Sequence, residues 1–192
     1  MALENIKADL RRFYIIEASK ENPGIGKKLY VLFENPGLQA LIVYRFGVWL
    51  KSLKVLLPLR LVLEPVYWLL HWSLIVVAGI RINRNTRIGK GLYIGHFGGI
   101  EIGGIEIGEN CSIHQHVKIG IRGNAGTAGE KIGNEVWIGA HSRIQGNIMI
   151  GDGATISAGS TVLNDVKDHA LVVGNPARMV VQHYENRKLL AI

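Results

Sequence analysis

The sequence is poor in the residues that build several common kinds of site. Its 192 residues include one cysteine, Cys111, so a disulfide within one chain is excluded, as expected in a reducing compartment. Charged residues make up 19% and aromatic residues 7%, and no Lys/Arg cluster with interleaved aromatics occurs, which argues against nucleic-acid binding. The first twenty residues are charged and lack the apolar core of a signal peptide.

Motifs of several enzyme classes are also missing. There is no GxSxG, no P-loop and no GxGxxG that opens a helix, so hydrolase and nucleotide-fold interpretations have no support. His114 and His116 are close enough to suggest zinc, but no Cys-rich or HExxH pattern accompanies them. We therefore expect no metal.

What the sequence does contain is a six-residue repeat of branched aliphatic residues. A one-residue slip separates its first two runs, and an interruption separates the last two. The members are Ile82, Ile88, Ile94, Ile100; Ile107, Ile113, Ile119; and Ile132, Ile138, Ile144, Ile150, Ile156, Val162. A period of six fits neither the 3.6 of a helix nor the 2 of a strand, and many members are followed by Gly, which suits tight corners.

This period predicts a mainly β fold, a parallel β-helix with triangular coils, in which each coil side is a short strand. The alternative is a sandwich of short strands. Cys111 falls four residues after a repeat position, where small or apolar residues recur, so we expect it to be a small buried residue.

The chain divides into three expected regions. Residues 1–80 form an α-helical N-terminal region, with helices expected over 3–20, 36–53 and 58–78. Residues 81–168 form the β-helix, and the Gly-rich stretch 121–131 should leave one corner as a loop. Residues 169–192 form a C-terminal extension with a turn at 174–177 and a partly helical tail from Met179.

The segment between Glu64 and Arg81 is ambiguous. Its sixteen residues carry no full charge, which is short of the ~20 that span a bilayer. Three alternatives stay open: burial in an oligomer or against the coil, peripheral membrane contact, and a true span. Residues 1–81 carry 11 basic and 6 acidic residues, 11 − 6 = +5 of the net +7, which suits an anionic membrane surface. We expect a cytoplasmic protein, with the inner face of the membrane as the alternative location.

Four histidines lie on the repeat, namely His96, His114, His116 and His141. His96 is two positions after Ile94, whereas His114 and His116 are one and three positions after Ile113, where side chains tend to point outward and can line a surface groove. A neutral imidazole can take a proton from a hydroxyl near pH 7. The competing interpretation of each is a surface residue at a corner. It is favoured for His114 and His116, most of all for His141, and not for His96.

Four stretches resemble the hexapeptide-repeat acyltransferases, in particular the serine acetyltransferase branch and its exopolysaccharide O-acetyltransferase relatives. They are GKGLYIGHFGGIEIG, SIHQHVKIG, IGNEVWIGAHSRIQGNIMIGDGATISAGSTVL and VVGNPARMV, within about Ile80 to Val181. The resemblance implies a left-handed parallel β-helix and a homotrimer, with acetyl-CoA lying in the groove between neighbouring coils.

The resemblance also implies roles for individual residues. His96 matches the catalytic base, which would deprotonate the acceptor hydroxyl for direct attack on the thioester. Residues whose backbone lines the pantetheine arm are matched by Gly139, Ala140, Ala158 and Gly159. His114 and His116 are candidates for an assisting role, and Tyr93 and Phe97 are candidates for the acceptor site.

Three departures from the serine acetyltransferase pattern concern the acceptor. An Asp precedes the catalytic His in that branch, where this chain has Gly95, and an Asp fifteen residues before the His is replaced by Arg81. The Arg-His pair that meets the serine carboxylate is replaced by the Gly129-Glu130-Lys131 region.

A free amino acid needs charged partners, so these departures favour an uncharged acceptor. The main prediction is acetyl transfer to a saccharide hydroxyl of a polysaccharide or its precursor. The alternatives are serine O-acetyltransferase, acting in cysteine biosynthesis with a rearranged acceptor site, and a non-catalytic β-helix scaffold.

Overall fold

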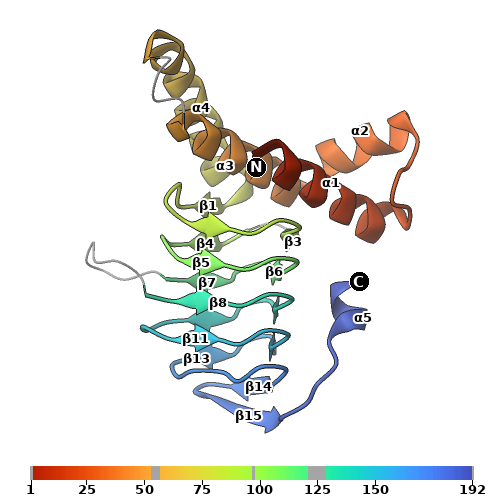
Figure 1. Cartoon of the computed structure of the whole chain (residues 1–192), viewed down its shortest axis with the longest axis vertical. Helices are drawn as coiled ribbons and strands as arrows, with labels where there is room; N and C mark the ends of the chain where they lie inside the picture. The colour runs from red at the N-terminus through yellow and green to blue at the C-terminus, as the bar shows by residue number, and fades with distance from the viewer. Residues whose placement is uncertain (1, 53–56, 97, 121–128, 192) are drawn as a thin grey trace.

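A computed structural model describes residues 2–52, 57–96, 98–120 and 129–191. Four helices stand on one end of a column of β coils, and the chain end returns along the side of the column (Figure 1). The helices are α1 (Ala2–Ala18), α2 (Ile25–Glu34), α3 (Pro36–Ser52) and α4 (Leu57–Ala78). Helix α2, which follows Asn22-Pro23-Gly24, is not among the helices expected from the sequence.

The column is built from three sheets, and each coil adds one strand to each of them. Sheet A holds β1 (Ile80–Ile82), β4 (Ile100–Ile102), β7 (Lys118–Ile119), β10 (Arg143–Ile144) and β13 (Thr161–Val162). Sheet B holds β2 (Arg87–Ile88), β5 (Glu106–Ile107), β8 (Lys131–Ile132) and β11 (Met149–Ile150).

Sheet C holds β3 (Tyr93–Gly95), β6 (Ser112–His114), β9 (Trp137–Ile138), β12 (Thr155–Ile156), β14 (Leu171–Gly174) and β15 (Ala177–Val181). The strand pairs are parallel except the final hairpin of β14 and β15, which is antiparallel. The predicted fold class, a parallel β-helix preceded by a helical region, is confirmed.

The register differs from the predicted count in the first coil. Ile82 pairs with Ile102 rather than with Ile100, and Ile102 pairs with Ile119. The step along the chain from Ile94 in sheet C to Ile102 in sheet A is therefore eight residues long. The corresponding steps in the later coils are six residues long. The period count misplaced the irregularity because Ile100 and Ile102 are both buried and alternate within one strand.

The core is a set of stacked, inward-pointing side chains. One column at the corner before sheet C consists of Leu92, Cys111, Val136, Ala154 and Ala170, all fully buried. Burial raises the pKa of the Cys111 thiol to about 12, because desolvation disfavours the thiolate. Cys111 is thus the small buried residue that its place in the repeat predicts.

A buried ion pair joins the helices to the coil. Arg45 of α3 donates to the carbonyls of Ile88 and Gly89 at 2.7 and 2.5 Å and to the Asp9 carboxylate of α1 at 3.0 Å. Asp9 in turn accepts the N–H groups of Gly91 and Leu92 at 2.8 and 3.1 Å. Because both charges are buried and hydrogen-bonded, helices and coil are held in one arrangement.

A second buried arginine reaches the chain end. Arg12 of α1 donates to the Gly91 carbonyl at 2.8 Å and to the Leu190 carbonyl at 3.2 Å. Leu190 ends helix α5 (Arg187–Leu190), and the Asn186 side chain before it donates to the carbonyls of Glu135 and Gly153. The tail is thus fastened along the column.

The end of the β-helix lies beyond the boundary predicted at residue 168. Thr155 pairs with Leu171, so β14 continues sheet C, and β15 closes it as a hairpin. Met179–Val181, predicted to begin a partly helical tail, belongs to β15, and the helical part of the tail is α5. Residues 121–128 of the predicted loop lie outside the described residues.

Helix α4 is largely uncovered. In its stretch Pro58–Ala78, 11% of the residues are buried, and the helix is long and apolar enough to cross a membrane by length and composition. Within one chain, α4 is therefore not buried against the end of the coil, which was one of the alternatives.

Candidate active site

The edge between sheets C and A gathers nearly all of the predicted site residues. This C–A edge consists of the segments 96–99, 115–117, 139–142 and 157–160, which connect a strand of sheet C to the next strand of sheet A. It carries, or adjoins at the end of β6, His96, His114, His116, His141, Gly139, Ala140, Ala158 and Gly159. Phe97 lies outside the described residues.

His96 sits at the enlarged corner of the first coil. Its φ of 63° places it in the left-handed region, and its side chain is exposed. The Gly98 N–H donates to the Ala78 carbonyl at 2.9 Å, and the His116 N–H donates to the Gly98 carbonyl at 2.8 Å. The two extra residues of this coil thus form a hydrogen-bonded bulge that starts at the His96 backbone.

The orientation of His114 is fixed by a backbone carbonyl. Its Nδ1 lies 3.0 Å from the Ile138 carbonyl oxygen, and its ring packs 4.8 Å from that of Trp137. Burial lowers the pKa of His114, and a positive charge on nearby His96 lowers it further. A neutral His114 must donate from Nδ1, which leaves Nε2 as an unprotonated acceptor.

Gly95 lets the rings of His114 and Tyr93 approach its backbone closely. A Cβ added at Gly95 would lie 3.3 Å from His114 Nε2 and 2.9 Å from the Tyr93 ring. A larger residue at position 95 would therefore press on both rings. The glycine thus lets the His114 ring stand close to the chain one residue before His96.

His116 and His141 stack one above the other at the same edge. Their ring centroids are 4.6 Å apart with an interplanar angle of 15°, and both residues are left-handed, with φ of 58° and 62°. A Cβ at Gly99 would lie 2.3 Å from the His116 ring. His141, for which a plain surface role was favoured, therefore belongs to the histidine group, which coil stacking assembles from distant parts of the sequence.

Below the histidines the edge becomes a strip of small residues. The Gly159 N–H donates to the Ala140 carbonyl at 2.8 Å, and Ala158 and Gly159 are exposed. A Cβ at Gly159 would meet nothing within 4 Å, whereas one at Gly139 would lie 2.5 Å from the Ala158 nitrogen. Gly139 thus permits close stacking of coils, and Ala158 and Gly159 leave the strip without large side chains.

Tyr93 is tied to helix α1. Its hydroxyl donates to Glu17 at 2.7 Å, and its ring lies 4.8 Å from that of Phe13. Burial and the Glu17 carboxylate raise the pKa of Tyr93. Its ring faces Gly95, but its hydroxyl is already engaged.

Other positions singled out by the sequence lie elsewhere. Arg81 stands on the outer face of sheet A, 3.9 Å from Glu101. Glu130 and Lys131 lie at the corner between sheets A and B, where the Glu130 side chain is buried and accepts the Gly146 N–H at 3.1 Å. Among the described residues, no three His, Cys, Asp or Glu side chains are grouped so that they could hold a metal ion. A metal-free mechanism stays a prediction.

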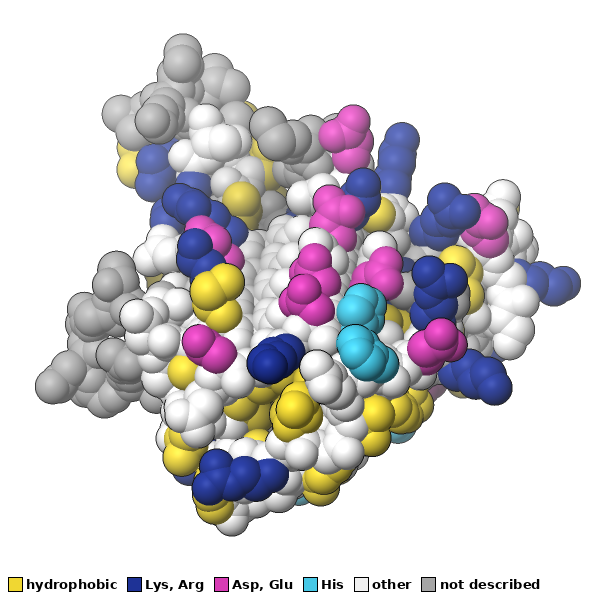
Figure 2. All heavy atoms as spheres, turned by 60° about the horizontal axis from the view of Figure 1, so that its bottom comes forward, with side chains coloured by type: hydrophobic (Ala, Val, Ile, Leu, Met, Phe, Trp, Pro, Cys, Tyr) yellow, Lys and Arg dark blue, Asp and Glu magenta, His cyan; other side chains and the backbone are white. Residues whose placement is uncertain are grey.

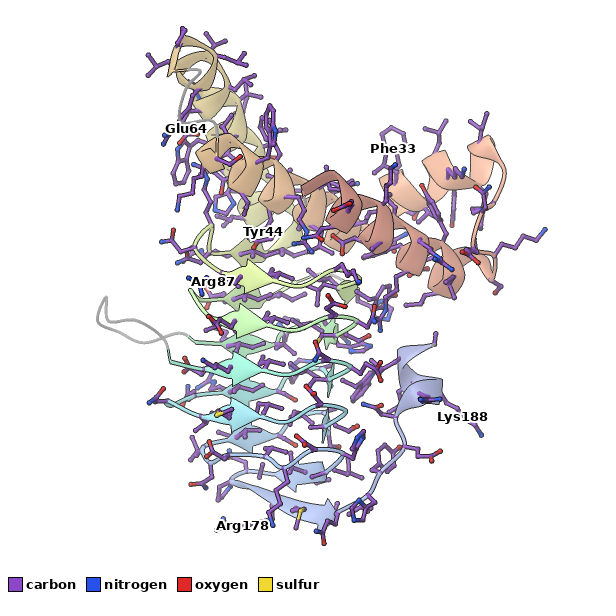
Figure 3. All side chains as sticks on the ribbon, in the orientation of Figure 1. Phe33, Tyr44, Glu64, Arg87, Arg178 and Lys188 are labelled. Atoms are coloured by element: carbon purple, nitrogen blue, oxygen red, sulfur yellow. The ribbon has the colours of Figure 1, made fainter. Side chains whose placement is uncertain are left out.

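A large groove lies on a different face. It has a volume of about 1080 Å³, runs along sheet B below α3, and is lined by Tyr44, Arg87, Gly108, Gly133 and Asp168 among others. Figure 3 shows Tyr44 and Arg87 where the helices meet the coil. Figure 2 shows a strip of backbone and small side chains with charged side chains on both sides. The histidines do not line this groove, because they stand on the C–A edge.

Comparisons with known proteins agree with this fold. Residues 131–164 match the family model "Bacterial transferase hexapeptide (six repeats)". A serine acetyltransferase of Synechococcus elongatus is 34% identical over 179 residues, which is 92% of this chain and 68% of that protein. The chain belongs to the serine acetyltransferase family. It is therefore an acyltransferase that uses acetyl-CoA.

Solved structures of serine acetyltransferases superpose on most of the chain. The enzyme of Neisseria gonorrhoeae matches with a TM-score of 0.76 at 30% identity, covering 97% of this chain and 67% of that one. The soybean enzyme complexed with serine matches with a TM-score of 0.73 at 34% identity, covering 93% and 69%.

These similarities correct the predicted acceptor. The prediction of a saccharide O-acetyltransferase is wrong, because relatives that match over most of the chain are serine acetyltransferases. The departures at Gly95, Arg81 and the Gly129-Glu130-Lys131 region were given too much weight. A side chain that is lost at one position can be replaced by a neighbouring residue that binds the same substrate group. Membership of an enzyme family also removes the non-catalytic scaffold.

Proposed function

We propose that this protein is a serine O-acetyltransferase that transfers the acetyl group of acetyl-CoA to the hydroxyl of L-serine. The observation that carries the proposal is the C–A edge, where His96, a neutral His114 and a strip of small residues lie in successive coils. Family membership supplies the reaction class, and the soybean relative was solved with serine bound.

The reaction proceeds in one transfer step. His96 takes the proton of the serine hydroxyl while the hydroxyl oxygen attacks the thioester carbonyl carbon, which gives a tetrahedral oxyanion. The carbon–sulfur bond then breaks, and the coenzyme A sulfur leaves with the proton held by His96. The products are O-acetylserine and coenzyme A, and the imidazole returns to its neutral form.

His114 gives the acceptor side of this site a defined polarity. Because its Nδ1 is engaged with the Ile138 carbonyl and its side chain is partly exposed, Nε2 keeps a lone pair that a substrate can use. A serine ammonium group that reached this ring would donate to Nε2, so His114 would do what the resemblance implies for a carboxylate on residue 95. Its lowered pKa keeps it an acceptor at neutral pH.

The proposed active unit is a homotrimer in which acetyl-CoA lies between the coils of two protomers. One wall of the pantetheine site would consist of Gly139, Ala140, Ala158 and Gly159. A neighbouring protomer would supply the other wall. An exposed strip with an open face at Gly159 fits half of such a site. A trimer should appear in sedimentation experiments at the mass of three chains.

Coenzyme A release with L-serine tests the proposed reaction. Because Cys111 is fully buried, a thiol reagent can follow the released coenzyme A in the folded enzyme. L-alanine, which lacks the hydroxyl, is the negative acceptor. No release above the L-alanine level would overturn the serine assignment.

Two variants test the histidines. His96→Ala should lower kcat by roughly 10²–10⁴-fold, while coenzyme A still protects the protein against thermal unfolding. His114→Phe should raise KM for L-serine at least about tenfold, as expected for one lost charged hydrogen bond, and leave KM for acetyl-CoA nearly unchanged. His183→Ala, at an exposed position near the chain end, is the control. Full turnover in His96→Ala would remove His96 from the mechanism.

A further inference from the structure

Helix α4 presents a broad apolar face to solvent. Val62, Leu69 and Val76 stand seven residues apart along its middle, and their side chains are 69%, 66% and 60% exposed. Trp68 and Trp72 flank this line and are also exposed. The transfer reaction at the C–A edge makes no use of this face.

The apolar face extends over more than half of the helix circumference. At 3.6 residues per turn, the exposed apolar residues from Trp68 to Leu70 cover an arc of roughly 200°. Ser73 is the polar residue within the arc, and its hydroxyl donates to the Leu70 carbonyl at 2.8 Å. Such a face is wider than the stripe with which a helix usually packs on one partner helix.

The opposite side of α4 is fixed to the rest of the protein. Glu64 accepts from Arg84 at 2.7 and 3.1 Å, and the Arg84 guanidinium lies 4.5 Å from the buried Tyr67 ring. A Cβ at Gly47 of α3 would lie 2.3 Å from that ring. The helix therefore cannot turn its apolar arc inward without breaking these contacts.

A second apolar surface lies on the same end of the molecule. Helix α2 exposes Ile25, Leu29, Tyr30 and Phe33, and in Figure 1 α2 and the beginning of α4 lie at the end of the molecule away from β15. Figure 3 shows Phe33 on α2 and Glu64 on α4 at opposite sides of this layer. Between α1, α3 and α4 lies an apolar hollow of about 510 Å³, lined by Phe46, Trp49 and Leu70 among others.

The charges around α4 identify the partner as anionic. Asp9 pairs with the buried Arg45 and Glu64 with Arg84, so within the described parts of α2, α3 and α4 the remaining charges are Lys27, Lys28, Lys51 and Arg60 against Glu34. Two copies facing each other through α4 would bring this positive region against itself. An anionic lipid surface satisfies both the apolar arc and the positive charge.

We propose that the outer face of α4 docks this protein onto an anionic lipid bilayer, with the helix lying in the interface. The aromatic rings of Trp68 and Trp72 suit the boundary between headgroups and acyl chains. The helix lies flat rather than crossing, because the Glu64–Arg84 pair and the Tyr67 contact hold its inner side against α3 and the coil. The proposal does not depend on the acceptor of the acetyl group.

Vesicle sedimentation with the full chain tests this proposal. The native protein should sediment with vesicles of phosphatidylcholine and phosphatidylglycerol, and much less with phosphatidylcholine alone or at high salt. Leu69→Asp, in the centre of the arc, should weaken binding roughly tenfold or more. Leu163→Asp, at an exposed leucine on the coil, is the matched control and should bind like the native protein.

Three outcomes would overturn the proposal. The first is a native protein that stays in solution with anionic vesicles, and the second is a Leu69→Asp variant that binds them as well as the control. The third is a native protein that ignores vesicles while Leu69→Asp lowers its mass in light scattering, which would assign the face to a second copy. Unchanged circular dichroism and coenzyme A release in both variants show that folding is not the cause.

Discussion

The coil and the helical layer use apolar residues in opposite ways. In the coil, the repeated isoleucines are buried and the outer faces carry charged pairs such as Arg87 with Glu106. In the helical layer, α3 is mostly buried but α4 and α2 direct large apolar side chains to solvent. The coil is therefore complete within one chain except along its edges, whereas the helical layer presents a surface built for contact with something else.

The strongest test concerns the joint between the two regions. Arg45→Met would leave the buried Asp9 carboxylate without its ionic partner, so the free energy of unfolding should fall by about 3–5 kcal/mol. Urea denaturation followed by circular dichroism measures this loss. If the variant lost much less, the helical layer would be held to the coil by packing alone.

The same substitution in both regions measures how much each buries. Ile138→Val removes one methylene from a fully buried position and should lower the free energy of unfolding by about 0.5–1.5 kcal/mol. Ile25→Val, at a site that is 78% exposed on α2, should change it by less than about 0.5 kcal/mol. An equal loss at Ile25 in dilute protein would show that α2 is covered in solution.

Acidification should weaken the coil through His114. Burial lowers its pKa in the folded protein from the ordinary 6.5, so below pH 6.5 the unfolded chain binds the proton more readily. Its contribution to stability is complete above pH 6.5 and declines as the pH falls from 6.5 through the folded pKa. Denaturation midpoints at about pH 7.5 and about pH 5.5 should differ less in His114→Phe.

Any pH dependence of stability that remains in His114→Phe is expected from His71 on α4. His71 also has its pKa lowered by burial, so it acts with the same sign. A native protein whose stability rose on acidification in this range would contradict the proposed neutral state of both histidines.

The smallest effect is expected on the outer face of the coil. Arg87 is 82% exposed and lies 2.8 Å from Glu106, so Arg87→Gln should change the free energy of unfolding by less than about 0.5–1 kcal/mol. A larger loss in urea denaturation would mean that the outer ion pairs of the coil contribute as its core does.

The sequence was enough to predict the coil but not its first turn. Ile132, Ile138 and Ile144 repeat without interruption, and each lies in the sheet that the period predicts. Ile100 and Ile102 alternate in one strand, so counting could not show that the corner at His96 has two extra residues. That difference depends on which of two buried isoleucines pairs with Ile82, which is a tertiary choice.

The site was predictable residue by residue but not as an arrangement. His96 and the small residues Gly139 and Ala158 could be placed by resemblance, whereas the stack of His116 on His141 depends on the length of the loop between their coils. The carbonyl that holds His114 belongs to Ile138, twenty-four residues further along the chain. The acceptor was misjudged because the sequence shows that position 95 lacks a carboxylate. It does not show that the His114 ring lies close to that position.

The thiol of Cys111, in the middle of the column, can be used to measure how often the column opens. Cys111 is fully enclosed, and its pKa of about 12 leaves almost no thiolate near neutral pH. A labelling reagent can therefore reach it only when this part of the column opens. The rate of labelling would report directly how often the stack comes apart, coil from coil, while the enzyme is at work.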